Sequence, residues 1–275
     1  MTERALHFGV DGQLLGTICT ASPGCRHSGN LGLILLNAGI VHRIGPHRFN
    51  VKLARHAAEM GIPSLRFDMS GRGDSGFEKQ AKGYRETAIS DIREAVRKLA
   101  EDEKVTRFVL FGICSGAIDG YAAALEEPRI VSLVMFDPYV FPTIRSRVRE
   151  FLGKLRRYGI VQGINRLQVL RHVRKSPESA ADTAVGAELP PIEQYTADLR
   201  RLVQRGARVH LVYSGSSCDQ VEYETQRRKL LANGLDPLVC TEFIPGVDHV
   251  ITSLSAQREI LSCFAAWVGA LEAAE

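Results

Sequence analysis

The stretch Phe108-Val-Leu-Phe-Gly-Ile-Cys-Ser-Gly-Ala117 decides the fold that we expect for this chain. Four apolar residues run into the pattern glycine–x–cysteine–x–glycine, and a helix-like segment follows at once. This pattern is typical of a sharp turn between a strand and a helix, with cysteine where serine is usual. Glycines two positions before and after the centre let such a turn close without side-chain clashes. The sequence therefore predicts that Cys114 stands exposed at the end of a strand.

The surrounding sequence alternates between apolar runs and amphipathic segments. A turn at Asp11-Gly12 predicts an antiparallel hairpin over residues 6–21. The remaining predicted strands are 31–36, 62–67, 105–111, 130–136, 207–213 and 238–244. The predicted helices are 47–60, 85–101, 115–126, 191–205, 221–233 and 256–271. This alternation indicates an α/β fold with a mostly parallel twisted sheet flanked by helices. The rhythm breaks once, so we expect a core of residues 1–138 and 191–275 with a helical cap or lid at 139–190.

Composition excludes several classes of protein. The chain has 275 residues, of which 45% are hydrophobic and 24% charged, and a net charge of +4. These values are typical of a globular protein with an ample core and give no sign of nucleic-acid binding. No apolar run is long enough to span a bilayer, and the N-terminus has no signal-peptide core, so we expect cytoplasmic residence. The six cysteines show no metal-binding spacing and no phosphate-binding loop appears, so neither metal nor cofactor is expected.

Three chemically reactive side chains each follow a predicted strand, in the order Cys114, Asp219, His249. Ligand sites in open α/β sheets lie beyond the carboxyl ends of the strands, so these side chains are expected to converge. His249, in a glycine-containing loop before the last helix, is the predicted base. Asp219 is the predicted acid that orients it. The alternative acids are Asp137, Glu222 and Asp248.

The loop after the 31–36 strand is expected to complete the site. The predicted oxyanion hole combines the Ser115 N–H with an N–H from Gly39 or Ala38, because small residues permit close backbone approach. The predicted substrate contacts in the same loop are Ile40, His42 and Arg43.

Three motifs together carry a resemblance to a known superfamily. They are Asn37-Ala-Gly followed by His42-Arg-Ile-Gly-Pro-His-Arg48, Leu65-Arg-Phe-Asp-Met-Ser-Gly-Arg-Gly-Asp-Ser75, and the Gly112–Ala117 turn. Over nearly its whole length the chain resembles the α/β-hydrolase superfamily, and within it the bacterial serine-aminopeptidase-like and exosortase-associated hydrolases. The central cysteine also looks like that of dienelactone hydrolases and certain thioesterases. The resemblance implies an α/β-hydrolase fold with the catalytic triad and oxyanion hole named above. In the second motif, Asp68, Asp74 and Ser75 are interpreted as a structural turn.

The predicted cap is strongly basic. Residues 145–175 hold ten lysines and arginines against one acid, Glu150, with apolar residues between them. This pattern predicts amphipathic helices. A basic, apolar lid over a thiol would suit an acyl-thioester substrate, such as acyl-coenzyme A or an acyl carrier protein docking on the cap. A solvated basic face on an ordinary lid is the equal alternative, a membrane-surface role is a weaker one, and stable membrane insertion and nucleic acid are not expected.

These features predict acyl transfer through a covalent acyl-Cys114 intermediate on a Cys–His–Asp triad. The acceptor is either water, as in a thioesterase or esterase, or another nucleophile, as in an acyltransferase of secondary-metabolite or lipid biosynthesis. The alternatives are a non-catalytic hydrolase-like binding or scaffold protein and a hydrolase of the dienelactone type.

Overall fold

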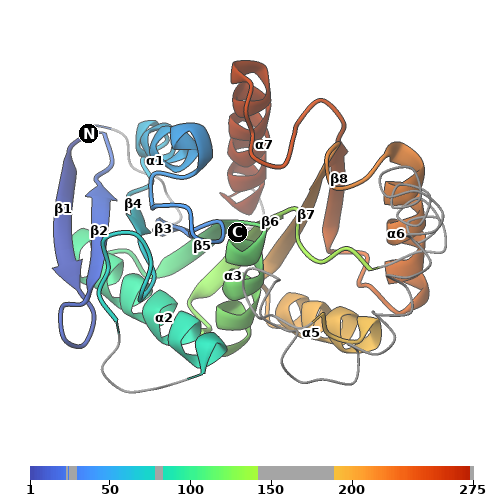
Figure 1. Cartoon of the computed structure of the whole chain (residues 1–275), viewed down its shortest axis with the longest axis horizontal. Helices are drawn as coiled ribbons and strands as arrows, with labels where there is room; N and C mark the ends of the chain where they lie inside the picture. The colour runs from blue at the N-terminus through green and yellow to red at the C-terminus, as the bar shows by residue number, and fades with distance from the viewer. Residues whose placement is uncertain (23, 25–29, 78–82, 142–188, 273–275) are drawn as a thin grey trace, which may run out of the picture.

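The protein is described by a computed structural model that covers residues 1–22, 24, 30–77, 83–141 and 189–272 (Figure 1). Nearly all of the predicted cap, 139–190, and the whole basic segment 145–175 lie outside the described residues. The strands are β1 (Glu3–Phe8), β2 (Leu14–Cys19), β3 (Leu31–Leu35), β4 (Ser64–Phe67), β5 (Arg107–Ile113), β6 (Ile130–Phe136), β7 (Arg208–Ser214) and β8 (Cys240–Ile244). The helices are η1 (Pro46–Arg48), α1 (Phe49–Glu59), α2 (Tyr84–Glu103), α3 (Ser115–Glu126), α5 (Ile192–Gln204), α6 (Gln220–Ala232) and α7 (Leu254–Glu272).

The strands of the described residues form one sheet in the order β1-β2-β4-β3-β5-β6-β7-β8. The N-terminal hairpin is antiparallel, and β2 also pairs antiparallel with β4. Every other pairing is parallel, from β4 through β3 and β5 to β8. The predicted fold class, with an antiparallel hairpin at one edge, is confirmed. Parallel strands place their carboxyl ends along one edge of the sheet, where the loops carrying Cys114 and His249 emerge.

Two helical layers cover the sheet, as Figure 1 shows. Side chains alternate along β5: Phe108 and Leu110 pack into a core shared with α2, α3, α5 and α6. Val109 and Phe111 face the other way, toward α1 and α7. This alternation follows from the period of two in a strand, and it explains why β5 reads as one continuous apolar run. Strand β5, which leads into the turn at Cys114 (called the elbow below), is therefore buried on both faces and fixed in position.

The start of the first helix differs from the sequence prediction. The helix expected from residue 47 begins as α1 at Phe49, after a short 3-10 segment. His47 and Arg48 both have positive φ angles, 49° and 60°, which helical residues do not adopt. Pro46 and this left-handed pair turn the chain sharply before α1. The predicted start of the helix was therefore two residues too early.

No helix among the described residues has both the length and the apolar character that crossing a membrane requires.

Candidate active site

Cys114 lies in a strained turn between β5 and α3. Its φ and ψ angles are 56° and −119°, a region that a non-glycine residue rarely occupies. Its backbone N–H donates to the carbonyl of Phe136 on β6 (2.9 Å), and its own carbonyl accepts from the N–H of Ala117 (3.0 Å). Such a conformation costs about 1–3 kcal/mol and persists only where neighbouring structure enforces it. The result is a partly buried thiol at the N-terminal end of α3.

The two glycines of the turn are required by close backbone contacts. A Cβ on Gly112 would lie 2.4 Å from the backbone carbon of Gly116, and one on Gly116 would lie 2.2 Å from the carbonyl oxygen of Asn37. Neither contact is sterically possible, because backbone atoms cannot move aside as a flexible side chain does. The predicted strand–turn–helix geometry at Cys114 is thus confirmed.

His249 and Asp137 meet at the same edge of the sheet. His249 lies in the loop between β8 and α7, and its Nδ1 is 2.7 Å from Oδ2 of Asp137, the first residue after β6. Asp137 is almost fully buried, and it also accepts hydrogen bonds from the backbone N–H (2.7 Å) and the hydroxyl (2.6 Å) of Ser214. Its φ angle of 48° is again left-handed. The carboxylate is therefore held on two sides and fixes the orientation of the imidazole.

The ionisation of Cys114 and His249 is coupled. The hydrogen bonds of His249 with Asp137 and with the Cys114 sulfur raise the pKa of His249 to about 10. The hydrogen bond with His249 lowers the pKa of the Cys114 thiol, and it outweighs the opposing effect of burial. Burial by itself would raise the pKa of Asp137, but the hydrogen bonds from His249 and Ser214 lower it below its usual range. All three directions favour a thiolate beside an imidazolium, itself paired with a carboxylate.

Solved structures with the same architecture cover the chain end to end. An esterase of Pyrococcus furiosus is similar over 98% of this chain and 91% of its own, with a TM-score of 0.63 and 16% identity. The chain has the α/β-hydrolase fold. A proline iminopeptidase of Mycobacterium smegmatis (TM-score 0.61, 16% identity, 99% of each chain) is also similar. So is a dienelactone hydrolase of Anabaena variabilis (TM-score 0.59, 14% identity, 97% of this chain and 96% of that one). No protein-family model and no curated protein sequence matches the chain.

The carboxylate beside His249 belongs to Asp137 and not to the predicted Asp219, which corrects the prediction from the sequence. In the α/β-hydrolase order of nucleophile, acid and histidine, both Asp137 and Asp219 follow a strand. Asp219 instead caps the N-terminus of α6, where its Oδ1 accepts a hydrogen bond from the backbone N–H of Glu222 (2.8 Å). The acidic residue three positions later makes Asp219-Gln-Val-Glu222 a helix-capping pattern, a signal that was present in the sequence. Asp137 had a matching signal, because it follows the last residue of a buried strand directly.

The alternative acid Asp248 also points elsewhere. Its carboxylate accepts from the backbone N–H (2.7 Å) and the hydroxyl (2.6 Å) of Thr252. These hydrogen bonds close the turn that follows His249, so Asp248 shapes the loop that carries the imidazole.

The structure brings together two of the three predicted oxyanion residues. The backbone N–H of Gly39 donates to the Ser115 hydroxyl (2.7 Å), so β3's loop and the elbow are in direct contact. The Ser115 N–H points to the Cys114 sulfur and contributes to the lowered pKa of that thiol. Ala38 lies beside them, with its carbonyl accepting from Val41 (2.9 Å). The assignment of Ser115, Gly39 and Ala38 as oxyanion donors stays a prediction.

The predicted substrate contacts divide into two kinds. The Arg43 guanidinium lies 2.6 Å from Asp68 and 2.7 Å from Asp74, and only 13% of its side chain is exposed, so it anchors the loop rather than facing open solvent. Asp68 also accepts from the backbone N–H groups of Arg43 (2.6 Å) and Asp74 (3.1 Å), which confirms the predicted structural turn. His42 lies 2.9 Å from Asp74. Ile40 is 84% exposed and stays a predicted substrate contact together with His42.

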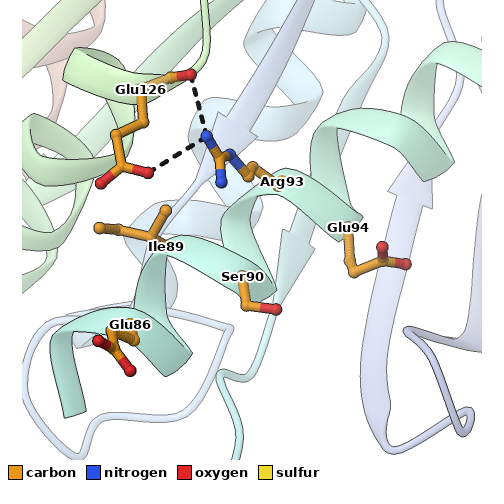
Figure 2. A pocket seen from close by; sticks show the side chains of 6 residues that line it. All are labelled: Glu86, Ile89, Ser90, Arg93, Glu94 and Glu126. Atoms are coloured by element: carbon orange, nitrogen blue, oxygen red, sulfur yellow. Dashed lines mark hydrogen bonds and ion pairs between the residues drawn. The ribbon is translucent and has the colours of Figure 1, made fainter. Parts of the chain in front are cut away.

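A hollow of about 380 Å³ is lined by residues of α2 and by the last residue of α3, and Cys114 is not among them. Figure 2 shows Arg93 of α2 reaching across to Glu126 of α3, where it forms an ion pair (3.2 Å) and donates to the carbonyl oxygen (3.1 Å). Of its lining residues only Glu126 belongs to α3, and it ends that helix, about 18 Å along the axis from the end that Cys114 precedes. The hollow is therefore not part of the candidate active site.

Proposed function

We propose that this protein catalyses acyl transfer from an ester or thioester through a covalent intermediate on Cys114. The observation that carries the proposal is the connected series Cys114–His249–Asp137 at a nucleophile elbow. A thiolate next to an imidazolium is the form that a cysteine nucleophile needs, and a buried carboxylate keeps the imidazole in one orientation. The start of α3 adds the positive end of a helix dipole.

In the proposed reaction the Cys114 thiolate attacks the acyl carbonyl carbon, and the electron pair of the C=O bond moves to its oxygen. Backbone N–H groups of the 38–39 loop and of Ser115 are the proposed partners for this oxyanion. When the carbonyl reforms, the bond to the leaving thiol or alcohol breaks, and His249 gives that group its proton. His249 then takes a proton from the acceptor, water or another nucleophile, which attacks the acyl-Cys114 thioester and regenerates the thiolate.

A thioester is the favoured donor, because attack by a thiolate exchanges one thioester for another of similar energy. The acyl enzyme then stays activated for transfer. The basic segment 145–175, outside the described residues, suits an anionic carrier such as coenzyme A or an acyl carrier protein. The similar fold of the Anabaena dienelactone hydrolase adds a lactone to the substrates to be tried.

The test is intact-protein mass spectrometry after brief incubation with short- and long-chain acyl-coenzyme A, a nitrophenyl ester and a lactone. The expected result is one acyl adduct, mapped to the peptide that contains Cys114, released by hydroxylamine and absent in Cys114→Ala. An adduct on the exposed Cys240 instead would be surface acylation and would count against the proposal. A folded protein that binds an acyl donor without forming an adduct would identify a binding protein with a hydrolase fold.

A further inference from the structure

A second cluster of cysteine, histidine and carboxylate lies at the sheet edge formed by β7 and β8. His210 of β7, Glu242 of β8 and Cys263 of α7 each offer one ligand atom, and all three atoms lie within 4.8 Å of one another. The strand register brings them together, since His210 pairs with Cys240 and Val212 with Glu242. Residues two apart on a strand share a face, so these side chains turn toward α7. Three elements distant in sequence thus supply one group of ligands.

The contacts inside the cluster are short. The Cys263 thiol donates to Oε2 of Glu242 over 3.1 Å, and Nε2 of His210 lies 2.9 Å from the same oxygen. His210 is only 3% exposed. Its ring is held by Trp267 of α7, whose ring centroid is 4.6 Å away and whose Nε1 donates to Ser132 (2.9 Å). A buried imidazole is thus fixed with its Nε2 close to a carboxylate.

The close contacts of His210 are poorly aligned. Among the described residues neither ring nitrogen has a hydrogen-bond partner along its N–H direction, despite the 2.9 Å approach to Glu242. Buried polar atoms are nearly always satisfied, so this one calls for an explanation. The Glu242 carboxylate thus lies close to the ring without serving as a well-aligned acceptor for it.

We propose that His210, Glu242 and Cys263 bind a divalent transition-metal ion, with Zn²⁺ as the best chemical match. The donors are one nitrogen, one oxygen and one sulfur, a set that suits Zn²⁺ and does not suit Mg²⁺ or Ca²⁺, which prefer oxygen throughout. Ligand atoms around a tetrahedral zinc lie about 3.3–3.8 Å apart, so small side-chain shifts suffice. Binding replaces the proton of the Cys263 thiol, which passes to solvent.

An ion at this position would join the edge strand β8 to α7. The loop between these two elements carries His249, so the ion would brace the segment that holds the imidazole at the active site. Ligand spacing along the chain did not predict this site, because the three residues come from separate elements. The inference stands apart from the proposed acyl transfer, since it concerns different residues on a different part of the sheet.

Two other groups of potential ligands compete. His42, Asp68 and Asp74 also offer converging atoms, but the Arg43 guanidinium lies 2.6 Å and 2.7 Å from those two carboxylates and supplies the positive charge itself. The active-site trio of Cys114, His249 and Asp137 is the second competitor, because its thiolate is an attractive ligand for a soft cation. The experiment must therefore remove the Cys114 thiol.

The test uses the full-length Cys114→Ser protein, freed of metal with a chelator and titrated with Co²⁺ as a spectroscopic probe. We expect one equivalent to bind, with a thiolate-to-cobalt charge-transfer band that Zn²⁺ displaces. Adding Cys263→Ser should abolish the band, and adding Cys263→Ser or Glu242→Gln should weaken binding by at least about 100-fold, since even outer-sphere changes cost 10–100-fold. The matched control is Asp74→Asn in the same background, in which Co²⁺ binding is expected to be unchanged.

The opposite outcomes are equally definite. If the folded Cys114→Ser protein gives no charge-transfer band, or if Cys263→Ser and Glu242→Gln both leave the affinity for Co²⁺ unchanged, the proposal is wrong. Circular dichroism establishes that each variant is folded, and Glu242→Gln, which preserves side-chain shape, decides the matter if Cys263→Ser does not fold. Zn²⁺ should also raise the melting temperature of Cys114→Ser and not of the Cys263→Ser double variant. Catalysis plays no part in these readouts, so they stand whether or not acyl transfer is found.

Discussion

The molecule contains two trios of cysteine, histidine and carboxylate with opposite arrangements. At the elbow His249 lies in the middle, between Cys114 and Asp137. At the β7–β8 edge the carboxylate of Glu242 lies in the middle, between Cys263 and His210. The neighbour of each thiol decides its chemistry: an imidazole lowers the pKa of Cys114, whereas burial and the Glu242 carboxylate raise that of Cys263. The same three residue types therefore favour a thiolate in one place and a protonated thiol in the other.

Backbone conformation separates the two trios as well. Cys114 and Asp137 both have positive φ angles, as does Ile251, two residues beyond His249. Cys263 lies inside the regular helix α7. Strain of this kind gathers at functional sites, because only a surrounding structure that specifies the site strongly can maintain it. The elbow trio, Cys114, His249 and Asp137, thus has strained backbone angles that the edge trio, His210, Glu242 and Cys263, lacks. This difference is consistent with chemistry at the elbow and ion binding at the edge.

The largest effect that tests this comparison is expected from His249→Ala. Removing the imidazole takes away both the proposed base and the cation that stabilises the Cys114 thiolate, so kcat/KM for the proposed acyl transfer should fall by roughly 10⁴-fold or more. Alkylation of Cys114 by iodoacetamide at neutral pH should fall in parallel, as measured by peptide mapping. The peptide containing Cys263 is the internal reference, and its low reactivity should not change. A variant that keeps the wild-type alkylation rate would show that the imidazole does not activate the thiol.

The next effect separates the two candidate acids. Asp137→Asn leaves a side chain of the same shape but no charge to orient His249, and kcat/KM is expected to fall by about 10³-fold. Asp219→Asn is the matched control: asparagine caps a helix as well as aspartate does, so activity should stay within about threefold of the wild type. A large loss in Asp219→Asn with none in Asp137→Asn would restore the assignment made from the sequence.

The sequence could predict the elbow but not its acid, and the reason is physical. The elbow is local: Gly112 and Gly116 are required by contacts within a few residues of one another and by the strand beside them. The choice between Asp137 and Asp219 depends on how far each lies from the end of its strand and on the φ angle of the residue. A left-handed backbone at an aspartate is not visible in an apolar pattern. The capping sequence Asp219-Gln-Val-Glu222 was the one feature of the sequence that indicated a structural role for Asp219.

The partners of Arg43 illustrate the same limit. Strands β3 and β4 pair in parallel, with Leu35 opposite Arg66, so the residues that follow them meet at one edge of the sheet. Only this register places Asp68 against Arg43, and it turns a predicted substrate contact into an anchor of the loop. The edge trio of His210, Glu242 and Cys263 could not be predicted from the sequence either. Its members converge only through the register of β7 with β8 and the packing of α7.

A moderate effect is expected in the pH dependence of Cys114 alkylation. The pKa of this thiol is lowered from 9.0 by His249, so the thiolate is already present below pH 9 and is lost as the pH falls through the lowered value. The midpoint of the alkylation profile should therefore lie below 9.0 in the wild type and move upward in His249→Ala, with each unit of pKa corresponding to a tenfold change in thiolate at low pH. Acyl transfer should also decline at the alkaline end, as His249 loses its proton near its raised pKa of about 10. A wild-type midpoint at or above 9.0 would contradict the thiolate–imidazolium pair.

The smallest effect is expected from Ser115→Ala. This variant tests whether the predicted oxyanion hole can be disturbed without a change in the reactivity of the Cys114 thiol. In Ser115→Ala the backbone N–H at position 115 remains, but the N–H of Gly39 loses the hydroxyl that it contacts at 2.7 Å. We expect the loop to be held less firmly, with kcat reduced by about tenfold, less than the 10²–10³-fold that loss of a direct oxyanion donor costs. The alkylation profile of Cys114 should be unchanged, because alkylation develops no oxyanion. Ser115→Thr keeps the hydroxyl and is expected to recover most of kcat, whereas equal losses of kcat and alkylation in Ser115→Ala would mean that the change disturbs the elbow itself.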